Sequence, residues 1–240
     1  MSKQFWGVII VVILALVGIF VLSGNNKAGN SGKSGSGSAG QLTQHIEGQG
    51  KSGVTLVEYG DYECPYCGQY APTVEQIATE YSQQIHFQFR NFPLVSVHQN
   101  AFAGARAAEA AALQGKFWEM NRLLYESQNQ WSSASNVPPI FDQYAQQLGL
   151  NLTKFKSDYN SGKVNDLINA DMAEGNKLNI QGTPTFFLDG KQIQVNNSVG
   201  DFEKLINAEI AKKTGNGSSA APTSAGTTSQ TPASQTPAKQ

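Results

Sequence analysis

Apolar and polar residues alternate or recur at helical spacing along the middle of the chain, and the pattern predicts a mixed α/β domain. Residues 54–59 form a nearly continuous apolar run, typical of a strand covered on both faces. A helical pattern over 68–82 follows, and residues 85–90 then alternate as in a half-buried strand. The polar positions of that alternation are His86, Gln88 and Arg90. The order strand, helix, strand predicts a βαβ unit with parallel pairing.

A long helical stretch follows and is predicted to be an insertion, at about 97–178, between two halves of one sheet. Asn151 has the residue type of a helix N-cap. Pro138-Pro139 is expected to stop the preceding element. The expected helices cover 101–126 with a break at Gly115, 140–150, 152–159 and 164–178.

The sheet is predicted to resume at 185–188, with a hairpin turn at Asp189-Gly190, a returning strand over 191–195 and a last helix over 201–212. Pro184 fits the first residue of a strand, a position that proline tolerates. It also fits a cis Thr183–Pro184 bond, which would bring its backbone against the cysteine pair and leave a peptide edge for a substrate chain. Both interpretations of Pro184 stay open.

The two ends of the chain differ in composition from its middle. Residues 5–22 form an uncharged apolar run that would span about 27 Å as a helix, near the thickness of one hydrocarbon core. The run exceeds the usual length in a cleaved signal peptide, and no clear cleavage site follows, so we favour an uncleaved anchor. The expected segments are a short cytoplasmic end at 1–4, the transmembrane anchor, a flexible Gly/Ser-rich linker at 23–41, the folded domain at 42–213 and a disordered Ser/Thr/Pro/Ala tail at 214–240.

The composition narrows the class of function. The chain has 240 residues, a net charge of −1 and 40% hydrophobic residues, which suits one globular domain with appendages. It has no basic stripe, so we expect no nucleic-acid partner. Two cysteines are too few for a disulfide scaffold.

Those two cysteines are Cys64 and Cys67, and they are placed where a strand turns into a helix. Cys64 is expected at the helix N-terminus, where free N–H groups and the helix dipole stabilise a thiolate, with Pro65 at the first helical position. One turn would bring Cys67 beneath Cys64, close enough for a disulfide. This favours redox chemistry over three alternatives: a structural disulfide, which constrains little in so short a loop, half a zinc site, for which no histidine has ligand spacing, and chance.

Glu58 is an unusual residue in the first apolar run. It could be a surface glutamate on an edge strand. It could also be a buried acid with a raised pKa that relays a proton to or from Cys67. The two interpretations have equal support from the sequence.

Taken together, several motifs resemble the DsbA-like thiol:disulfide oxidoreductases of the thioredoxin superfamily, especially the membrane-tethered bacterial forms. The resemblance covers about 53–211. The motifs are Glu58, Cys64-Pro65-Tyr66-Cys67, Arg90-Asn91-Phe92-Pro93-Leu94 with His98 and Ala101 after it, the alanine-rich 107–111, Gly115 to Met120, and Gly182-Thr183-Pro184-Thr185-Phe186-Phe187.

This resemblance implies a thioredoxin fold with a helical insertion and electron exchange with unfolded exported proteins. It also implies reoxidation by a membrane quinone-linked partner of the DsbB or vitamin-K-epoxide-reductase type, with no metal and no cofactor besides the redox pair. The catalytic domain is then expected outside the cytoplasm on a single-pass anchor, because an oxidant needs an oxidising compartment.

The resemblance assigns roles to single residues. Cys64 matches the attacking cysteine, Cys67 the resolving one and Pro184 the cis proline, with Thr183 before it. Glu58 matches the buried acid, and Pro65 and Tyr66 lie between the cysteines. His98 is expected only to begin a helix. Pro-Tyr between the cysteines and Thr before Pro184 also occur in reducing relatives, so a reductase or isomerase is the alternative to an oxidase, and a tethered chaperone or binding module is a third.

Overall fold

The computed structural model describes residues 40–215. The predicted anchor at 5–22, the linker before residue 40 and the tail from residue 216 lie outside the described residues. No helix within residues 40–215 is both long and apolar enough to span a bilayer.

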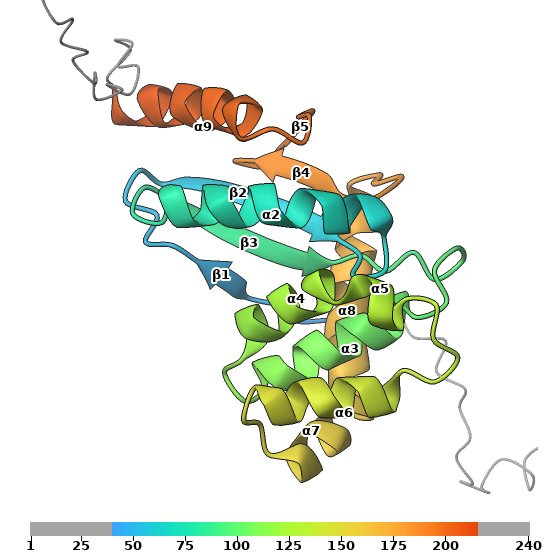
Figure 1. The fold of residues 1–240 in the computed structure, drawn as a ribbon. Coiled ribbons are helices and arrows are strands. Elements are labelled where there is room, and N and C mark those ends of the chain that lie inside the picture. Colours follow the sequence, from blue (N-terminus) through green and yellow to red (C-terminus); the bar gives the residue numbers. More distant parts are fainter. Residues whose placement is uncertain (1–39, 216–240) are drawn as a thin grey trace, which may run out of the picture. The chain divides into compact units, whose positions relative to one another are not determined.

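The described part is built on a five-stranded sheet with the strand order β1-β3-β2-β4-β5 (Figure 1). β2 and β3 pair in parallel, as the βαβ pattern predicted, and the other neighbours are antiparallel. β1 was not predicted, because three residues on a sheet edge are too short to show an alternation. The strands are β1 (His45–Glu47), β2 (Val54–Gly60), β3 (Ile85–Asn91), β4 (Thr185–Leu188) and β5 (Lys191–Ile193).

Two helices, α2 (Pro65–Glu80) and α9 (Val199–Thr214), cover one face of the sheet. Figure 1 shows α2 crossing the near face. Val54 and Leu56 of β2 point into this layer, and Ile77 and Phe202 of the two helices meet them in a fully buried core. Because side chains alternate along a strand, Glu58 lies on the same face as Leu56, under α2.

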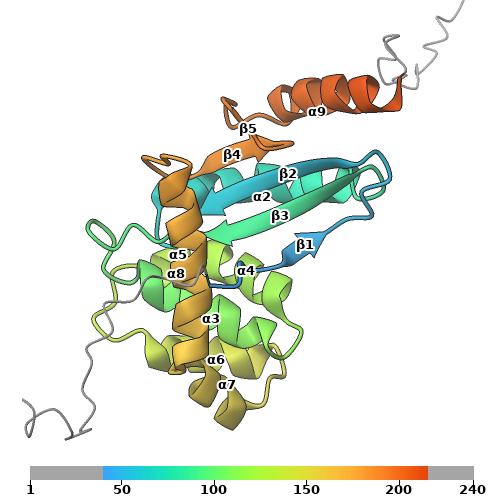
Figure 2. The ribbon, with the colours of Figure 1, turned by 180° about the vertical axis from the view of Figure 1, so that it is seen from behind.

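Six helices lie between β3 and β4 in the chain, so the predicted insertion is confirmed. They form a second core with the start of α2, and Figure 2 shows α8 beside the other face of the sheet. The helices are α3 (Ala101–Ala112), α4 (Phe117–Glu126), α5 (Gln128–Trp131), α6 (Pro138–Gln147), α7 (Leu152–Tyr159) and α8 (Gly162–Lys177).

Some local signals in the insertion were interpreted correctly and one was not. Gly115, with φ of 74°, breaks the long helix, and the Asn151 side chain accepts from the Lys154 N–H at 2.9 Å as an N-cap. Pro138-Pro139, however, begins α6 instead of stopping the element before it. The first helical turn leaves its N–H groups unused, so prolines fit there.

The prediction of a half-buried β3 is wrong, because Gln88 and Arg90 are each only 8% exposed. α8 covers their face, and its buried Asp171 pairs with the Arg90 guanidinium at 3.3 Å. Asp171 also accepts from the backbone N–H groups of Thr43 and Asn91. The polar half of the alternation is therefore satisfied inside the protein instead of by solvent.

Candidate active site

Cys64 occupies the N-cap position of α2, directly after the loop that follows β2. Its own N–H donates to the Asp61 carbonyl oxygen at 3.1 Å, and its carbonyl oxygen accepts from the Gly68 N–H at 3.1 Å. Pro65 is the first helical residue, where its missing N–H leaves no acceptor unsatisfied. The predicted placement of the cysteine pair at a helix N-terminus is confirmed.

The two thiols are free and differ in access. Cys64 is 4% exposed and Cys67 is fully buried. The chain at Thr183 lies against Cys64 and covers most of it. Tyr66 between them is 65% exposed. A large thiol partner could therefore reach only Cys64.

The two thiols also differ in acidity. The Cys67 thiol beside Cys64 is the largest cause that lowers the pKa of Cys64, to about 5, and burial opposes it. Thr183 and the N–H groups of Tyr66 and Cys67 lower the pKa of Cys64 further. Burial raises the pKa of Cys67 well above its usual range. At neutral pH the reduced pair therefore consists of one thiolate and one thiol.

The Thr183–Pro184 peptide bond is cis, so that interpretation of Pro184 is confirmed, and β4 begins at the next residue. Cys64 Sγ lies 3.3 Å from the Thr183 carbonyl oxygen, to which the thiol donates when it is protonated. A groove of about 230 Å³ runs beside this contact, between α2 and the β4–β5 hairpin. Its lining residues are Tyr66, Tyr70, Thr183, Pro184, Thr185, Phe186, Gln192, Ile193, Gln194 and Val195.

Glu58 is 3% exposed, which decides between its two interpretations in favour of the buried acid. Burial, and then the negative charge of Cys64, raise the pKa of Glu58 to about 8. At neutral pH most Glu58 carboxyl groups are therefore protonated. Glu58 also contributes to the raised pKa of Cys67, as expected for an acid under the cysteine pair.

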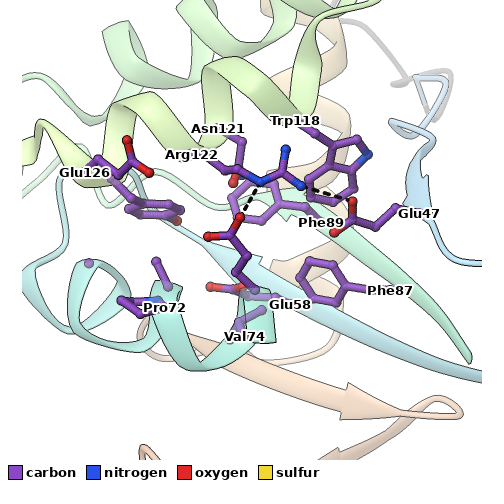
Figure 3. A pocket seen from close by; sticks show the side chains of 14 residues that line it. Glu47, Glu58, Pro72, Val74, Phe87, Phe89, Trp118, Asn121, Arg122 and Glu126 are labelled. Carbon is purple, nitrogen blue, oxygen red and sulfur yellow. Dashed lines mark hydrogen bonds and ion pairs between the residues drawn. The ribbon is translucent and has the colours of Figure 1, made fainter. Parts of the chain in front are cut away.

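A second cavity of about 230 Å³ reaches Glu58 between α2 and α4 (Figure 3). Aromatic rings form much of its wall, and Asn121 and Arg122 of α4 line it. The Arg122 guanidinium pairs with Glu75 at 2.7 Å and with Glu47 at 3.5 Å. The aromatic wall residues are Phe87, Phe89, Trp118 and Tyr125.

No role was predicted for Asp61, whose side chain is buried under the active-site loop. Its Oδ1 accepts from the Glu63 N–H at 2.8 Å, and its Oδ2 accepts from the Leu94 N–H at 2.9 Å and from His98 Nδ1 at 2.7 Å. The prediction that His98 begins a helix is wrong, because α3 begins at Ala101. His98 lies instead in the β3–α3 loop, where it contacts Asp61.

Gln128 of α5 is a second residue that the sequence did not single out. Its amide nitrogen donates to the carbonyl oxygens of Tyr62 at 2.8 Å and Cys64 at 2.9 Å. A Cβ on Gly68 would lie 2.7 Å from Gln128 Oε1, so the Gln128 side chain would have to move to admit a larger residue there. Through Gln128, the helical insertion thus contacts the active-site loop directly before α2.

Residues 41–208 match a family model described as thioredoxin. The chain belongs to the thioredoxin family. No group of three or more His, Cys, Asp or Glu residues within 40–215 of this thioredoxin-family chain could hold a metal ion. That the site uses no cofactor stays a prediction.

Solved structures place the fold within the family. The structure of oxidised BdbD from Bacillus subtilis is 23% identical with a TM-score of 0.63, and the match covers 71% of this chain and 96% of that one. Wolbachia pipientis alpha-DsbA1 is 22% identical with a TM-score of 0.61, covering 72% and 95%. The family model confirms the predicted thioredoxin superfamily, and these structures share the fold that the resemblance implied.

The chain is also similar in sequence to one part of a longer protein. The Na(+)/H(+) antiporter NhaA 1 of Mycobacterium sp. (strain KMS) is 36% identical over 152 residues, which are 62% of this chain and 24% of the antiporter. This chain matches about a quarter of the length of that relative. The similarity therefore concerns that quarter and gives no ground to assign ion transport to this chain.

Proposed function

We propose that this protein is a thiol:disulfide oxidoreductase that introduces disulfides into exported proteins through Cys64 and Cys67. One observation carries the proposal: Cys64 is the N-cap of α2 against the cis Thr183–Pro184 bond, while Cys67 is fully buried. This placement lowers the pKa of Cys64 to about 5 and raises that of Cys67 well above its usual range. A stabilised Cys64 thiolate favours the reduced pair, which makes the disulfide form an oxidant.

The exchange begins with the oxidised Cys64–Cys67 disulfide. A client thiolate attacks Cys64 Sγ, the bond to Cys67 breaks, and Cys67 leaves with the electron pair. A second client thiolate then attacks the client sulfur of the mixed disulfide and releases the Cys64 thiolate. The client loses two electrons to form its disulfide, and the cysteine pair gains them.

Glu58 has the properties of the proton donor in the first step. The departing Cys67 sulfur needs a proton because of its high pKa, and Glu58, with a pKa of about 8, holds one at neutral pH. The cavity between α2 and α4 gives Glu58 a route to solvent for the next proton. When the pair is reoxidised, the same carboxyl group takes the proton back.

The groove beside Cys64 suits an extended client chain. Thr183 presents its carbonyl oxygen at the sulfur, and the exposed Tyr66 ring forms the outer wall. A client that places its cysteine at Cys64 would lie along Pro184 and contact Tyr66.

The partners and location that we propose follow from this chemistry. Each turnover leaves the pair reduced, so a reoxidase must take the electrons, and we propose a membrane quinone-linked protein of the DsbB or vitamin-K-epoxide-reductase type. The apolar run 5–22 would anchor the chain in the cell membrane, with the domain on the extracytoplasmic side, where disulfides persist.

The reduction potential of the purified protein, measured against glutathione, tests the direction of exchange. The proposal predicts a value nearer about −120 mV, as in a strong oxidant, than about −270 mV, as in thioredoxin. A value near the thioredoxin one would favour a reductase or isomerase. Complete inertness toward dithiothreitol and glutathione disulfide would indicate a non-catalytic binding module instead.

A further inference from the structure

Asp61 touches both halves of the redox pair through its backbone. It follows the last residue of β2, and its carbonyl oxygen accepts from the Cys64 N–H at 3.1 Å. Its own N–H donates to Cys67 Sγ at 3.5 Å. A shift of the Asp61 backbone would therefore move a contact of each cysteine.

The side chain of Asp61 is fully buried, so a carboxylate there needs compensation. Two backbone N–H groups supply hydrogen bonds, those of Glu63 and Leu94. The charged partner is His98, whose Nδ1 lies 2.7 Å from Oδ2 and whose side chain is 19% exposed. His98 is thus both reachable by protons and bound to a buried anion next to the cysteines.

We propose that His98 is a positioning residue which, by neutralising the buried Asp61 carboxylate, keeps the Cys64 thiolate stable. This deepens the proposed function and rests on it. The cation that favours the thiolate comes from the β3–α3 loop, since the cysteine motif itself contains only Pro65 and Tyr66 between the two thiols.

The physical reason is electrostatic: the Asp61 carboxylate is buried, so water screens its charge poorly. An Asp61 carboxylate without a counter-ion would repel the Cys64 thiolate and raise its pKa. An imidazolium on Oδ2 cancels that repulsion. Because interactions between titrating groups are mutual, the thiolate must in turn favour the charged form of His98.

The groups that face His98 are consistent with a charged imidazole. Burial lowers the pKa of His98, but the hydrogen bond and charge of Asp61, together with Cys64 and Glu63, outweigh it and hold that pKa above its usual value. Cys64 itself faces Cys67 of α2 and Glu58 of β2. Because the pKa of His98 is held above its usual value and that of Cys64 is lowered to about 5, the imidazole is still charged when Cys64 begins to ionise.

The test is the pKa of Cys64 in His98→Gln, measured on the full chain by thiolate absorbance against pH. Glutamine can still donate to Asp61 but carries no charge. We expect the pKa of Cys64 to rise by about one unit, a tenfold loss of thiolate below its pKa. The same tenfold change makes the reduction potential about 30 mV more negative. An unchanged pKa and potential in a folded His98→Gln would overturn the inference.

The chain offers a matched control in His45, whose Nε2 lies 2.7 Å from the buried Glu109 carboxylate. His45→Gln removes a histidine from a histidine–carboxylate contact of the same length in another part of the domain. Its Cys64 should keep the wild-type pKa. Equal shifts in the two variants would mean a general effect of destabilisation and would contradict the role of His98.

A double variant separates charge from structure. Asp61→Asn with His98→Gln removes both charges, so the pKa of Cys64 should return toward the wild-type value. If it stays as high as in His98→Gln, charge compensation is not the cause. A wild-type Cys64 pKa near 9 would instead defeat the proposed function itself, whereas a low wild-type pKa with no response to His98→Gln would defeat only this inference.

Discussion

The groove and the cavity lie on different sides of α2 and differ in chemistry. The groove at the β4–β5 hairpin offers a carbonyl oxygen, a proline and an exposed tyrosine beside Cys64. The cavity toward α4 is walled by aromatic rings and leads to the buried acid Glu58. The difference indicates that a client thiol and a proton can approach the cysteine pair from separate sides. A client bound in the groove therefore need not block proton transfer through the cavity.

The largest effects are expected from substitutions of the two cysteines. Cys67→Ala should lose all net oxidation of a dithiol peptide, because the pair can no longer form its disulfide. Its Cys64 should form mixed disulfides with oxidised client proteins, visible on non-reducing gels. Cys64→Ala retains Cys67, which is fully buried, and should form none. Adducts of equal yield in the two variants would contradict the assignment of Cys64 as the attacked sulfur.

The acid side is tested by Glu58→Gln, which keeps the shape and removes the proton donor. We expect the rate of peptide oxidation at neutral pH to fall by about a hundredfold, the scale of general acid–base catalysis. Stopped-flow fluorescence at several pH values measures it. The reduction of the pair by a small thiol should slow as well, since that step also protonates Cys67. An unchanged rate would exclude Glu58 from proton transfer.

The same variant makes a prediction about stability. The pKa of Glu58 is raised in the folded state from 4.5 to about 8, so folding takes up a proton between these values and wild-type stability falls as the pH rises through that window. Glu58→Gln lacks this loss. At pH 8 the reduced variant should be more stable than wild type by on the order of 4 kcal/mol in urea unfolding, with little difference at pH 4.

The groove side is tested by Tyr66→Ser. Losing this exposed ring should raise the KM for a peptide client about fivefold, in line with about 1 kcal/mol for one surface aromatic contact, while the reaction with dithiothreitol stays unchanged. Ile46→Ser on β1 removes another exposed apolar residue and is the control. If dithiothreitol reacts as slowly as the peptide in Tyr66→Ser, the ring tunes the sulfur instead of binding the client.

The smallest effect is expected at the cavity wall. Arg122 is 37% exposed and pairs with Glu75 and Glu47, so Arg122→Met should cost less than about 1 kcal/mol in urea unfolding. Its oxidation rate should stay within about twofold of wild type, because the buried acid does not depend on this partly exposed cation. A rate loss as large as that of Glu58→Gln would make Arg122 part of the proton route.

The sequence predicted the parts of the site that adjacent residues specify. The strand, the cysteine motif and the helix are consecutive, and the Thr183-Pro184 segment has a recognisable local pattern. Asp61 and its contact with His98 were missed because that contact joins residues 37 apart, and Gln128 reaches Cys64 across 64 residues. Nothing in the local pattern of either segment reports such a pairing.

Burial of polar residues was the other limit. The alternation over 85–90 gave the correct strand but could not reveal that α8 would bring Asp171 to Arg90, 81 residues away. Glu58 had two equally supported interpretations for the same reason: its exposure depends on whether α2 and α4 cover it. In both places, tertiary packing decides whether a polar strand residue is buried, and the alternation along the strand does not.

The central claim is that Cys64 is a thiolate at neutral pH while Cys67 stays protonated. Thiolate absorbance of the reduced protein, followed against pH with Cys67→Ser as reference for the single remaining sulfur, tests it directly. The account predicts that the wild-type protein gains one thiolate with a midpoint near pH 5 and no second one below pH 9. A first midpoint near pH 9, or two thiolates appearing together, would contradict it.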